Sequence, residues 1–388
     1  MTRRRTTSTK MPPTIEYLLP PLKPESLQCI YRLQRYVPPL ESRRYPKRRS
    51  AAVAVILFVG RLGDLYVLLS TRAGDMRTYA HDTALPGGKY EEGDIDAEGT
   101  ARREAYEEIG LPMDRNKVMK LCELEKFITG NSLIVTPVIF IITDHTLTPL
   151  LNPEEVKRLF SMPLSAFLHS RPSQIPSFHY NISHRLSSIP SWVIDSIPPP
   201  PVVNYALDDG HVGGKEGRFY GYRDIIWATG PSTGTASSSA SSSEPISRTS
   251  MRESSTSRVE RTTSAGKGHA KESEGAEAAV ERGLGQGKVR MHRFLTGRES
   301  QGIKPVYGLT AAILIRAASV GFDQQPDFPI NAPGQKTMIQ RITHEIRHGE
   351  GPLRRAVEAE GLWDDWKGAD SDEEDHDHDN KGCAKAKL

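Results

Sequence analysis

The spacing of apolar residues along the chain predicts both helices and strands. Residues 26–37 carry apolar side chains near helical spacing, and two apolar runs of strand length, 51–59 and 65–70, flank a polar turn and predict a hairpin. Further strands are expected at 119–129, 133–144 and 217–228, and further helices at 96–109, 152–160 and 309–320. The chain therefore contains a folded part in which helices and strands are mixed.

Two of the expected helices have recognisable ends. Asp96 is the expected N-cap of a helix that stops before Gly110, a residue typical of the position that follows a helix. Pro153 is expected at the first position of the next helix, 152–160. Glu155 is then interpreted as an acid that complements the dipole of that helix, the other reading being a carboxylate near a functional site.

Composition divides the chain into folded and unfolded segments. The Ser/Thr/Gly/Ala-rich stretch 229–288 cannot bury enough apolar surface to offset its conformational entropy, so we expect a disordered insertion there. The remaining segments are a disordered N-terminal segment at 1–25, the first part of the domain at 26–228 with a Pro/Ser-rich loop at 171–201, the second part at 289–321, and a C-terminal extension with an acidic tail at 322–388.

Charge and cysteine content exclude several classes of protein. The chain has 388 residues, and 51 basic against 48 acidic residues exclude a polycation that binds nucleic acid by bulk charge. The scattered Cys29, Cys122 and Cys383 form neither a disulfide framework nor a metal spacing, which indicates a reducing compartment. The apolar run 133–142 is much shorter than the roughly 20 residues of a membrane helix, so no membrane span is expected.

The segment 85–111 carries the candidate chemistry. Pro86, Gly87 and Gly88 predict a tight turn at which the backbone can approach a ligand. In the helix that follows, Glu104, Glu107 and Glu108 are spaced so that they share one face, where hard oxygen ligands suit Mg²⁺ or Mn²⁺. Arg103 lies next to them and can hold Asp94 across the loop by a forked contact.

The helix alone leaves two interpretations open. A solvated patch of three glutamates needs no metal, because exposed like-charge pairs cost only about 0.2–0.5 kcal/mol each. In a partly buried patch, two like charges about 4 Å apart repel by about 4 kcal/mol at an effective dielectric of about 20, and a cation would be needed.

The whole segment resembles the Nudix box, whose usual form is G-x5-E-x7-R-E-U-x-E-E-x-G-U with U an aliphatic residue. The matching residues, in order, are Gly88, Asp94, Arg103, Glu104, Glu107, Glu108, Gly110 and Leu111. Asp94 replaces the usual Glu, the gap to Arg103 is eight residues rather than seven, and Ala105 is smaller than the usual aliphatic residue.

The acid and the longer gap resemble the coenzyme A diphosphatase branch of this family. That branch carries a basic motif before the box, which Thr71, Arg72 and Arg77 resemble, although Tyr79 and His81 depart from it. Its downstream N-P-x-E-V and G-L-T-A segments resemble residues 152–156 and 308–311.

The resemblance implies an α/β/α sandwich with a mixed sheet and Mg²⁺- or Mn²⁺-dependent cleavage of coenzyme A or its thioesters to 3′,5′-ADP and a 4′-phosphopantetheine product. It implies that Glu104 and Glu108 bind metal, that Glu107 is a ligand or the general base, and that Arg103 orients the box through Asp94. The residues assigned to substrate binding are Arg72, Arg77, Gly87 and Gly88. Two other hypotheses remain: a Nudix hydrolase for NADH, ADP-ribose or an oxidised nucleotide, and a non-catalytic Nudix module that binds a nucleotide or a protein.

The end of the sequence predicts a location. Ala386, Lys387 and Leu388 form a close variant of the S-K-L peroxisomal address, so a peroxisomal import receptor is an expected partner. The basic segment 3–10 leaves a mitochondrial location open, and a cytoplasmic one is the remaining possibility.

Overall fold

The computed structural model describes residues 15–39, 43–74, 81–171, 175, 219–227 and 287–367. An eight-stranded mixed sheet has the order β3-β2-β1-β7-β5, with β4 on β1, β6 on β7 and β8 on β2. Its strands are β1 (Ser50–Val59), β2 (Leu65–Arg72), β3 (Thr83–Ala84), β4 (Gly87–Lys89), β5 (Val118–Glu123), β6 (Phe127–Ile128), β7 (Ile134–Ile142) and β8 (Val156–Pro163). Of these pairs only β1 with β7 is parallel.

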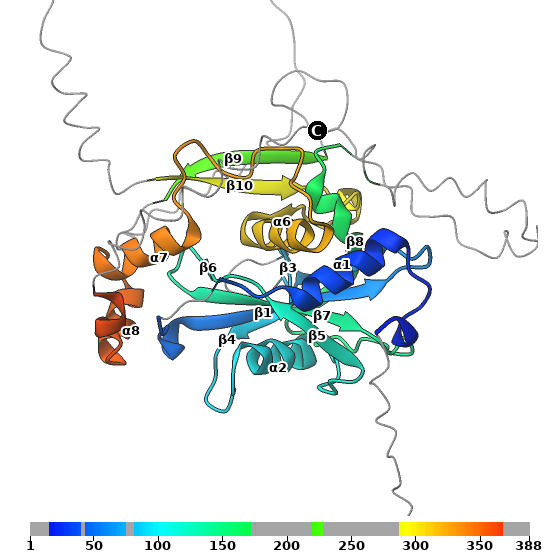
Figure 1. The fold of residues 1–388 in the computed structure, drawn as a ribbon, viewed down its shortest axis with the longest axis horizontal. Helices are drawn as coiled ribbons and strands as arrows, with labels where there is room; N and C mark the ends of the chain where they lie inside the picture. Colours follow the sequence, from blue (N-terminus) through cyan, green and yellow to red (C-terminus); the bar gives the residue numbers. More distant parts are fainter. Residues whose placement is uncertain are drawn as a thin grey trace, which may run out of the picture.

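Helices cover both faces of this sheet (Figure 1). They are α1 (Pro24–Arg35), α2 (Ala97–Ile109), α6 (Gly308–Phe322), α7 (Met338–Arg347) and α8 (Pro352–Ala359), with short 3-10 helices η1 (Ile15–Leu18), η2 (Lys47–Arg49), η3 (Leu164–Leu168), η6 (Glu299–Gln301) and η7 (Trp363–Trp366). A second, antiparallel sheet is made of β9 (Tyr220–Ile226), β10 (Lys288–Phe294) and β11 (Val306–Tyr307).

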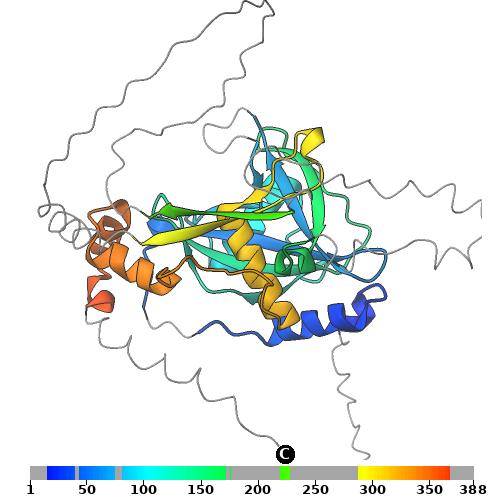
Figure 2. The ribbon, with the colours of Figure 1, turned by 90° about the horizontal axis from the view of Figure 1, so that it is seen from above.

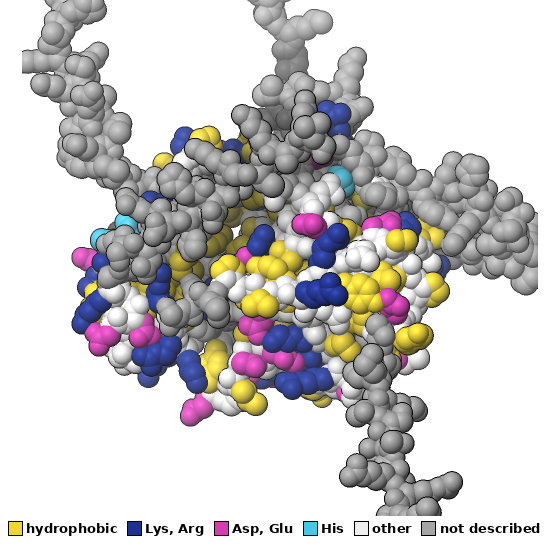
Figure 3. Space-filling model, in the orientation of Figure 1, with side chains coloured by type: hydrophobic (Ala, Val, Ile, Leu, Met, Phe, Trp, Pro, Cys, Tyr) yellow, Lys and Arg dark blue, Asp and Glu magenta, His cyan; other side chains and the backbone are white. Residues whose placement is uncertain are grey.

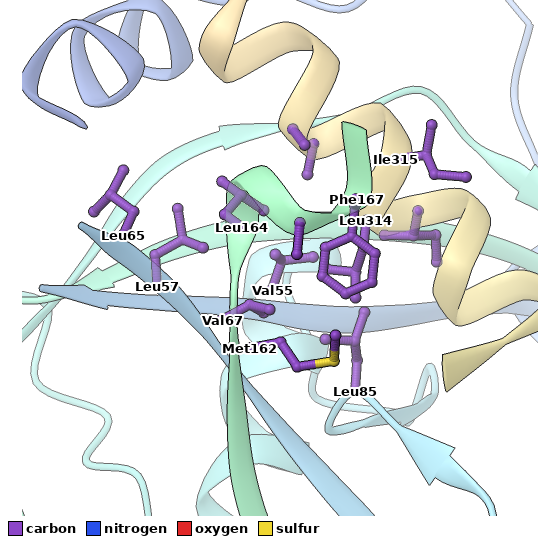
Figure 4. Packing of buried hydrophobic residues seen from close by; sticks show 14 of the residues in the cluster. Val55, Leu57, Leu65, Val67, Leu85, Met162, Leu164, Phe167, Leu314 and Ile315 are labelled. Carbon is purple, nitrogen blue, oxygen red and sulfur yellow. The ribbon is translucent and has the colours of Figure 1, made fainter. Parts of the chain in front are cut away.

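The apolar run of β1 is buried on both faces, because side chains alternate along a strand. Ala54 and Ile56 pack with α2 in one apolar cluster, and Val55 and Leu57 pack with α1 and α6 in another. Figure 4 shows Val55 and Leu57 directed toward η3 and α6. The resulting arrangement of α2, sheet, and α1 with α6 is the expected α/β/α sandwich.

The predicted helix at 152–160 is wrong, because the segment forms β8 instead. β8 pairs with β2 along its whole length, from Pro163 opposite Tyr66 to Val156 opposite Arg72. The N–H groups of Glu155 and Val156 both donate to the Asn152 carbonyl, so Pro153 lies in a turn rather than at a helix start. Pairing with a long neighbouring strand overrides the local helix signal.

Three other expectations need smaller corrections. The predicted strand 119–129 is two strands, β5 and β6. Gly87 and Gly88 lie in the short strand β4 opposite Val53 and Ala52, not in a tight turn. Residues 15–25 belong to the fold rather than to a disordered segment, since Ile15 and Leu19 are buried in the main core.

A part of the chain beyond 321 also folds, which the apolar pattern did not predict. Helices α7 and α8 and the helix η7 share an apolar cluster with Ile128 of β6 and Ile134 of β7. Trp366 is fully buried there and its indole N–H donates to the Arg44 carbonyl at 3.1 Å. None of the helices in the described part of the chain is both long enough and apolar enough to cross a membrane.

Residues 228–286, which contain most of the predicted insertion, lie outside the described residues, but the described residues on either side of them meet. β9 and β10 pair antiparallel up to Ile226 opposite Lys288, and the Trp227 N–H donates to the Gly287 carbonyl at 2.9 Å. The two strands therefore have the geometry of a hairpin that a two-residue turn could close.

Replacing 228–286 by Asn-Gly is therefore expected to preserve the fold. Shortening the loop lowers the entropic cost of closing it by up to about 3 kcal/mol, so the free energy of unfolding should be unchanged or higher. Thermal unfolding of the purified variant checks this. An insoluble variant, or one with a clearly lower melting temperature, would show that the segment is needed for folding.

Candidate active site

The box helix α2 begins and ends where the sequence predicts. The Asp96 carboxylate accepts from the Gly99 N–H at 2.8 Å, which satisfies one free donor of the first turn. Gly110 adopts φ 66°, and a Cβ there would lie 2.8 Å from Leu150. The N–H groups of Leu150 and Asn152 donate to the carbonyls of the last turn, so the loop before β8 is fixed to the end of α2.

Arg103 fastens the loop before α2 to the helix, as predicted. Its Nε and Nη2 atoms each lie 3.1 Å from one carboxylate oxygen of Asp94, and Nη2 also donates to the Lys89 carbonyl at 2.9 Å. Burial alone would raise the pKa of Asp94, but the contacts with Arg103, the Glu91 N–H and the Thr100 hydroxyl lower it below its usual range. Asp94 is therefore held as a carboxylate.

Gly88 leaves the space that the Glu104 carboxylate occupies. A Cβ at position 88 would lie 2.2–2.6 Å from the three atoms of that carboxylate, so no other residue fits without moving Glu104. At Gly87 a Cβ would lie 2.5 Å from the Ala52 carbonyl oxygen. The two glycines thus let β4 approach both β1 and the acidic face of α2.

Glu104, which is partly buried, and Glu108, which is buried, form an acidic pair on that face. Burial raises the pKa of the Glu108 carboxyl to about 8; Glu104 and Glu155 act in the same direction, and Arg72 and the Gly87 N–H oppose it. Burial also raises the pKa of Glu104, and the nearby Arg103 opposes that shift. The patch is therefore the partly buried one of the two interpretations, and the raised pKa values show that burial disfavours two negative charges there without a cation.

Two residues from other strands complete the site. The Ala73 N–H donates to the Glu155 carbonyl at 2.8 Å, which places Glu155 beside Arg72 at the end of β2. The electrostatic effects on Glu108 show that both side chains lie near it. Because 152–160 is not a helix, Glu155 is not a helix N-terminal acid, and its effect on the Glu108 pKa favours the alternative reading as a carboxylate near the site.

The remaining predicted residues lie differently. The Glu107 side chain is half exposed and receives a hydrogen bond of 3.0 Å from Arg103, whose Nη1 also contacts Glu104 at 3.0 Å. Arg77 lies outside the described residues. Figure 3 shows acidic and basic side chains side by side over the region of α2.

The donor set fits a hard divalent cation, although the cluster is not assembled. No three Asp, Glu, His or Cys side chains within the described ranges already surround a point where a metal could lie. Arg103 holds Glu104 and Glu107 in ion pairs instead. The carboxylates of Glu104 and Glu108 nevertheless offer the oxygen ligands that Mg²⁺ and Mn²⁺ prefer, and such an ion would favour the charged forms that burial disfavours.

Comparison with known proteins identifies the family of the domain that carries these residues. A family model described as the NUDIX domain matches residues 47–186. The mitochondrial Nudix hydrolase 15 of Arabidopsis thaliana is 46% identical over 124 residues, which cover 32% of this chain and 42% of that protein. Peroxisomal coenzyme A diphosphatase 1 of Saccharomyces cerevisiae is 33% identical over 169 residues, which cover 36% of this chain and 50% of that protein. The chain thus spans half or less of the length of these two relatives.

A shorter relative is matched over most of its length. A Nudix hydrolase of Photorhabdus laumondii, itself uncharacterised, is 32% identical over 157 residues, which cover 40% of this chain and 79% of that protein. The fold is that of an α/β/α sandwich whose sheet carries a carboxylate-bearing helix. The chain belongs to the Nudix family, as the resemblance of its box implied.

Proposed function

We propose that the protein is a metal-dependent hydrolase that cleaves the diphosphate of coenzyme A or its thioesters to 3′,5′-ADP and a 4′-phosphopantetheine product. The observation that carries this proposal is the pair of Glu104 and Glu108, whose carboxyl pKa values burial raises, on the face of α2 that meets Gly88. When bound there, Mg²⁺ or Mn²⁺ supplies a Lewis acid that neutralises the diphosphate and lowers the pKa of a bound water.

The side chains of the box would have different roles in this reaction. Glu104 and Glu108 would hold the ion, and the half-exposed Glu107 is either a further ligand or the base that orients or deprotonates water. Arg103 and Asp94 keep the loop that carries β4 in place against α2.

Arg72 supports the assignment of a phosphate-rich substrate. Its Nε atom is buried and has no hydrogen-bond partner in the described part of the chain, so the guanidinium has donor capacity that a phosphate oxygen could use. The substrate itself is inferred from the acid and spacing at Asp94 and from the similarity to the yeast coenzyme A diphosphatase. Arg77 would contribute a second cation to the same phosphates.

Product analysis with coenzyme A, NADH and ADP-ribose side by side tests the proposed substrate assignment. With Mg²⁺ or Mn²⁺ we expect release of 3′,5′-ADP from coenzyme A with the highest kcat/KM of the three, and Arg72→Gln should raise KM for coenzyme A. A preference for NADH or ADP-ribose would instead indicate a Nudix hydrolase that acts on that substrate. Absence of turnover with all three and with oxidised nucleotides would favour a non-catalytic binding module.

We also propose that the protein is located in peroxisomes. The yeast relative is named as a peroxisomal enzyme, whereas the Arabidopsis relative is named as mitochondrial. The segment Ala386–Leu388, which would contact the import receptor, lies outside the described residues. Imaging of an N-terminally tagged protein with and without Leu388 tests it, and an unchanged distribution would exclude this segment as the address.

A further inference from the structure

A small basic cavity lies apart from the box helix. It is bounded by the ends of β9 and β10 and by α7, and the space inside it for water-sized groups is about 20 Å³. Trp227, Lys288, Lys336, Arg341 and His344 contribute to its lining. Figures 1 and 2 show the ends of β9 and β10 beside α7, and Figure 1 shows α2 on the opposite side of the large sheet. All five residues lie outside residues 47–186, which match the family.

Arg341 is a buried cation without an acidic partner. The residue is 5% exposed, and its guanidinium lies over the Trp227 ring at 3.8 Å. Among the described residues, its buried Nε atom has no hydrogen-bond partner, and its Nη1 atom meets only the weak acceptor Sδ of Met338, at 3.4 Å. Glu345, one turn further along α7, accepts instead from the Ser132 hydroxyl at 2.9 Å.

This arrangement is unusual for a folded protein, because buried charges are normally paired. Burial lowers the pKa of Arg341 to about 10, which still leaves it charged at neutral pH. No carboxylate contributes to that shift. The guanidinium therefore retains a positive charge and unused hydrogen-bond donors, and the residue lines the cavity.

Two lysines add charge to the same cavity. Lys288 and Lys336 line it, and neither forms an ion pair within the described ranges. Asp224, the acid on the strand beside Lys288, is already held by Arg290 through two contacts of 2.8 and 3.0 Å. His344 lines the cavity as well and packs against His348, with 5.1 Å between the ring centres. Among the described residues, the lining of the cavity thus includes three cationic side chains and no carboxylate.

We propose that this cavity, the basic pocket, binds the phosphoryl group of a phosphomonoester. A phosphomonoester carries nearly two negative charges and three acceptor oxygens, which matches one guanidinium and two ammonium groups. A single carboxylate would leave most of this charge uncompensated. The cavity has room inside it for one phosphoryl oxygen. The same chemistry is presented by a phosphorylated side chain, by a nucleotide with a terminal phosphate and by free phosphate.

Binding is tested on the full chain by titration calorimetry with EDTA present, so that no metal at α2 contributes. The probes are inorganic phosphate, a phosphoserine peptide and 3′,5′-ADP, each compared with its unphosphorylated counterpart where one exists. We expect saturable binding of at least one phosphorylated probe and about tenfold or more weaker binding in the double variant Lys288→Gln/Lys336→Gln, since each charge-assisted hydrogen bond contributes roughly this factor.

A matched double variant separates a local effect from a change in net charge. Arg48→Gln/Arg355→Gln removes the same charge from two exposed residues that do not line the pocket and should bind like wild type. Glu108→Gln should also leave binding unchanged, because it alters only the box. Arg341→Gln should abolish binding. If this variant does not fold, the double variant Lys288→Gln/Lys336→Gln alone tests whether the cavity binds the probe.

The three probes distinguish the source of the phosphate. Selective binding of the phosphopeptide identifies a phosphoprotein partner, and selective binding of 3′,5′-ADP identifies a nucleotide. The proposal is overturned if no phosphorylated probe binds, or if the lysine variant binds as tightly as wild type.

Discussion

Glu104→Gln and Glu108→Gln are each expected to lower metal-dependent turnover by about a thousandfold or more, because a lost metal ligand removes several kcal/mol of transition-state stabilisation. Glutamine keeps the shape of glutamate and removes its charge. Since burial already raises the pKa of both carboxyls, removing either charge should not destabilise the metal-free protein. Steady-state kinetics and thermal unfolding of the two variants measure both effects.

Glu92→Gln is the matched control. Glu92 lies exposed in the loop before α2 and carries the same charge, so its variant should turn over substrate like wild type. Activity close to wild type in either Glu104→Gln or Glu108→Gln would rule out the metal assignment. A large fall in melting temperature would instead make the loss of activity uninformative about metal.

Arg103→Met is expected to lower the free energy of unfolding by about 3 kcal/mol, the usual cost of leaving a buried charge without its partner. The Asp94 side chain is 6% exposed and would keep only the Thr100 hydroxyl and the Glu91 N–H as donors. The loop would also lose its attachment to α2 through the Lys89 carbonyl. Chemical denaturation measures the stability, and kcat/KM per folded molecule should fall more than tenfold.

The neighbouring residue provides the control that separates stability from activity. Arg102 also forms a buried ion pair, with Glu98 at 2.7 Å, and lies over the Phe140 ring. Arg102→Met should therefore destabilise the protein but leave kcat/KM of the folded fraction unchanged, because this pair does not touch the acidic face of α2. Equal loss of activity in both variants would mean that Arg103 contributes only stability.

The parts of the fold that the sequence predicted are those with a strong local signal. β1 and β7 are apolar runs because both of their faces are buried. The ends of α2 follow from Asp96 and Gly110, whose side-chain oxygen and positive φ are local properties. The contact between Arg103 and Asp94 could be predicted because the box spacing places them on facing segments.

The parts that could not be predicted depend on distant contacts. The segment at 152–160 carries a helix start signal at Pro153, and only its pairing with β2 makes it a strand. That pairing also places Glu155 beside Glu108, which no spacing in the sequence indicates. The packing of α7 on β6 and of Arg341 on Trp227 joins residues more than a hundred positions apart.

Mn²⁺ binding measured directly on the purified, metal-free protein tests the central assignment, the acidic face of α2 as a divalent-cation site. Calorimetric titration should give saturable binding in wild type and in Glu92→Gln. It should give at least about tenfold weaker binding in Glu104→Gln and in Glu108→Gln, as expected when one charged ligand of the ion is lost. Mn²⁺ affinity unchanged in both box variants would contradict the assignment.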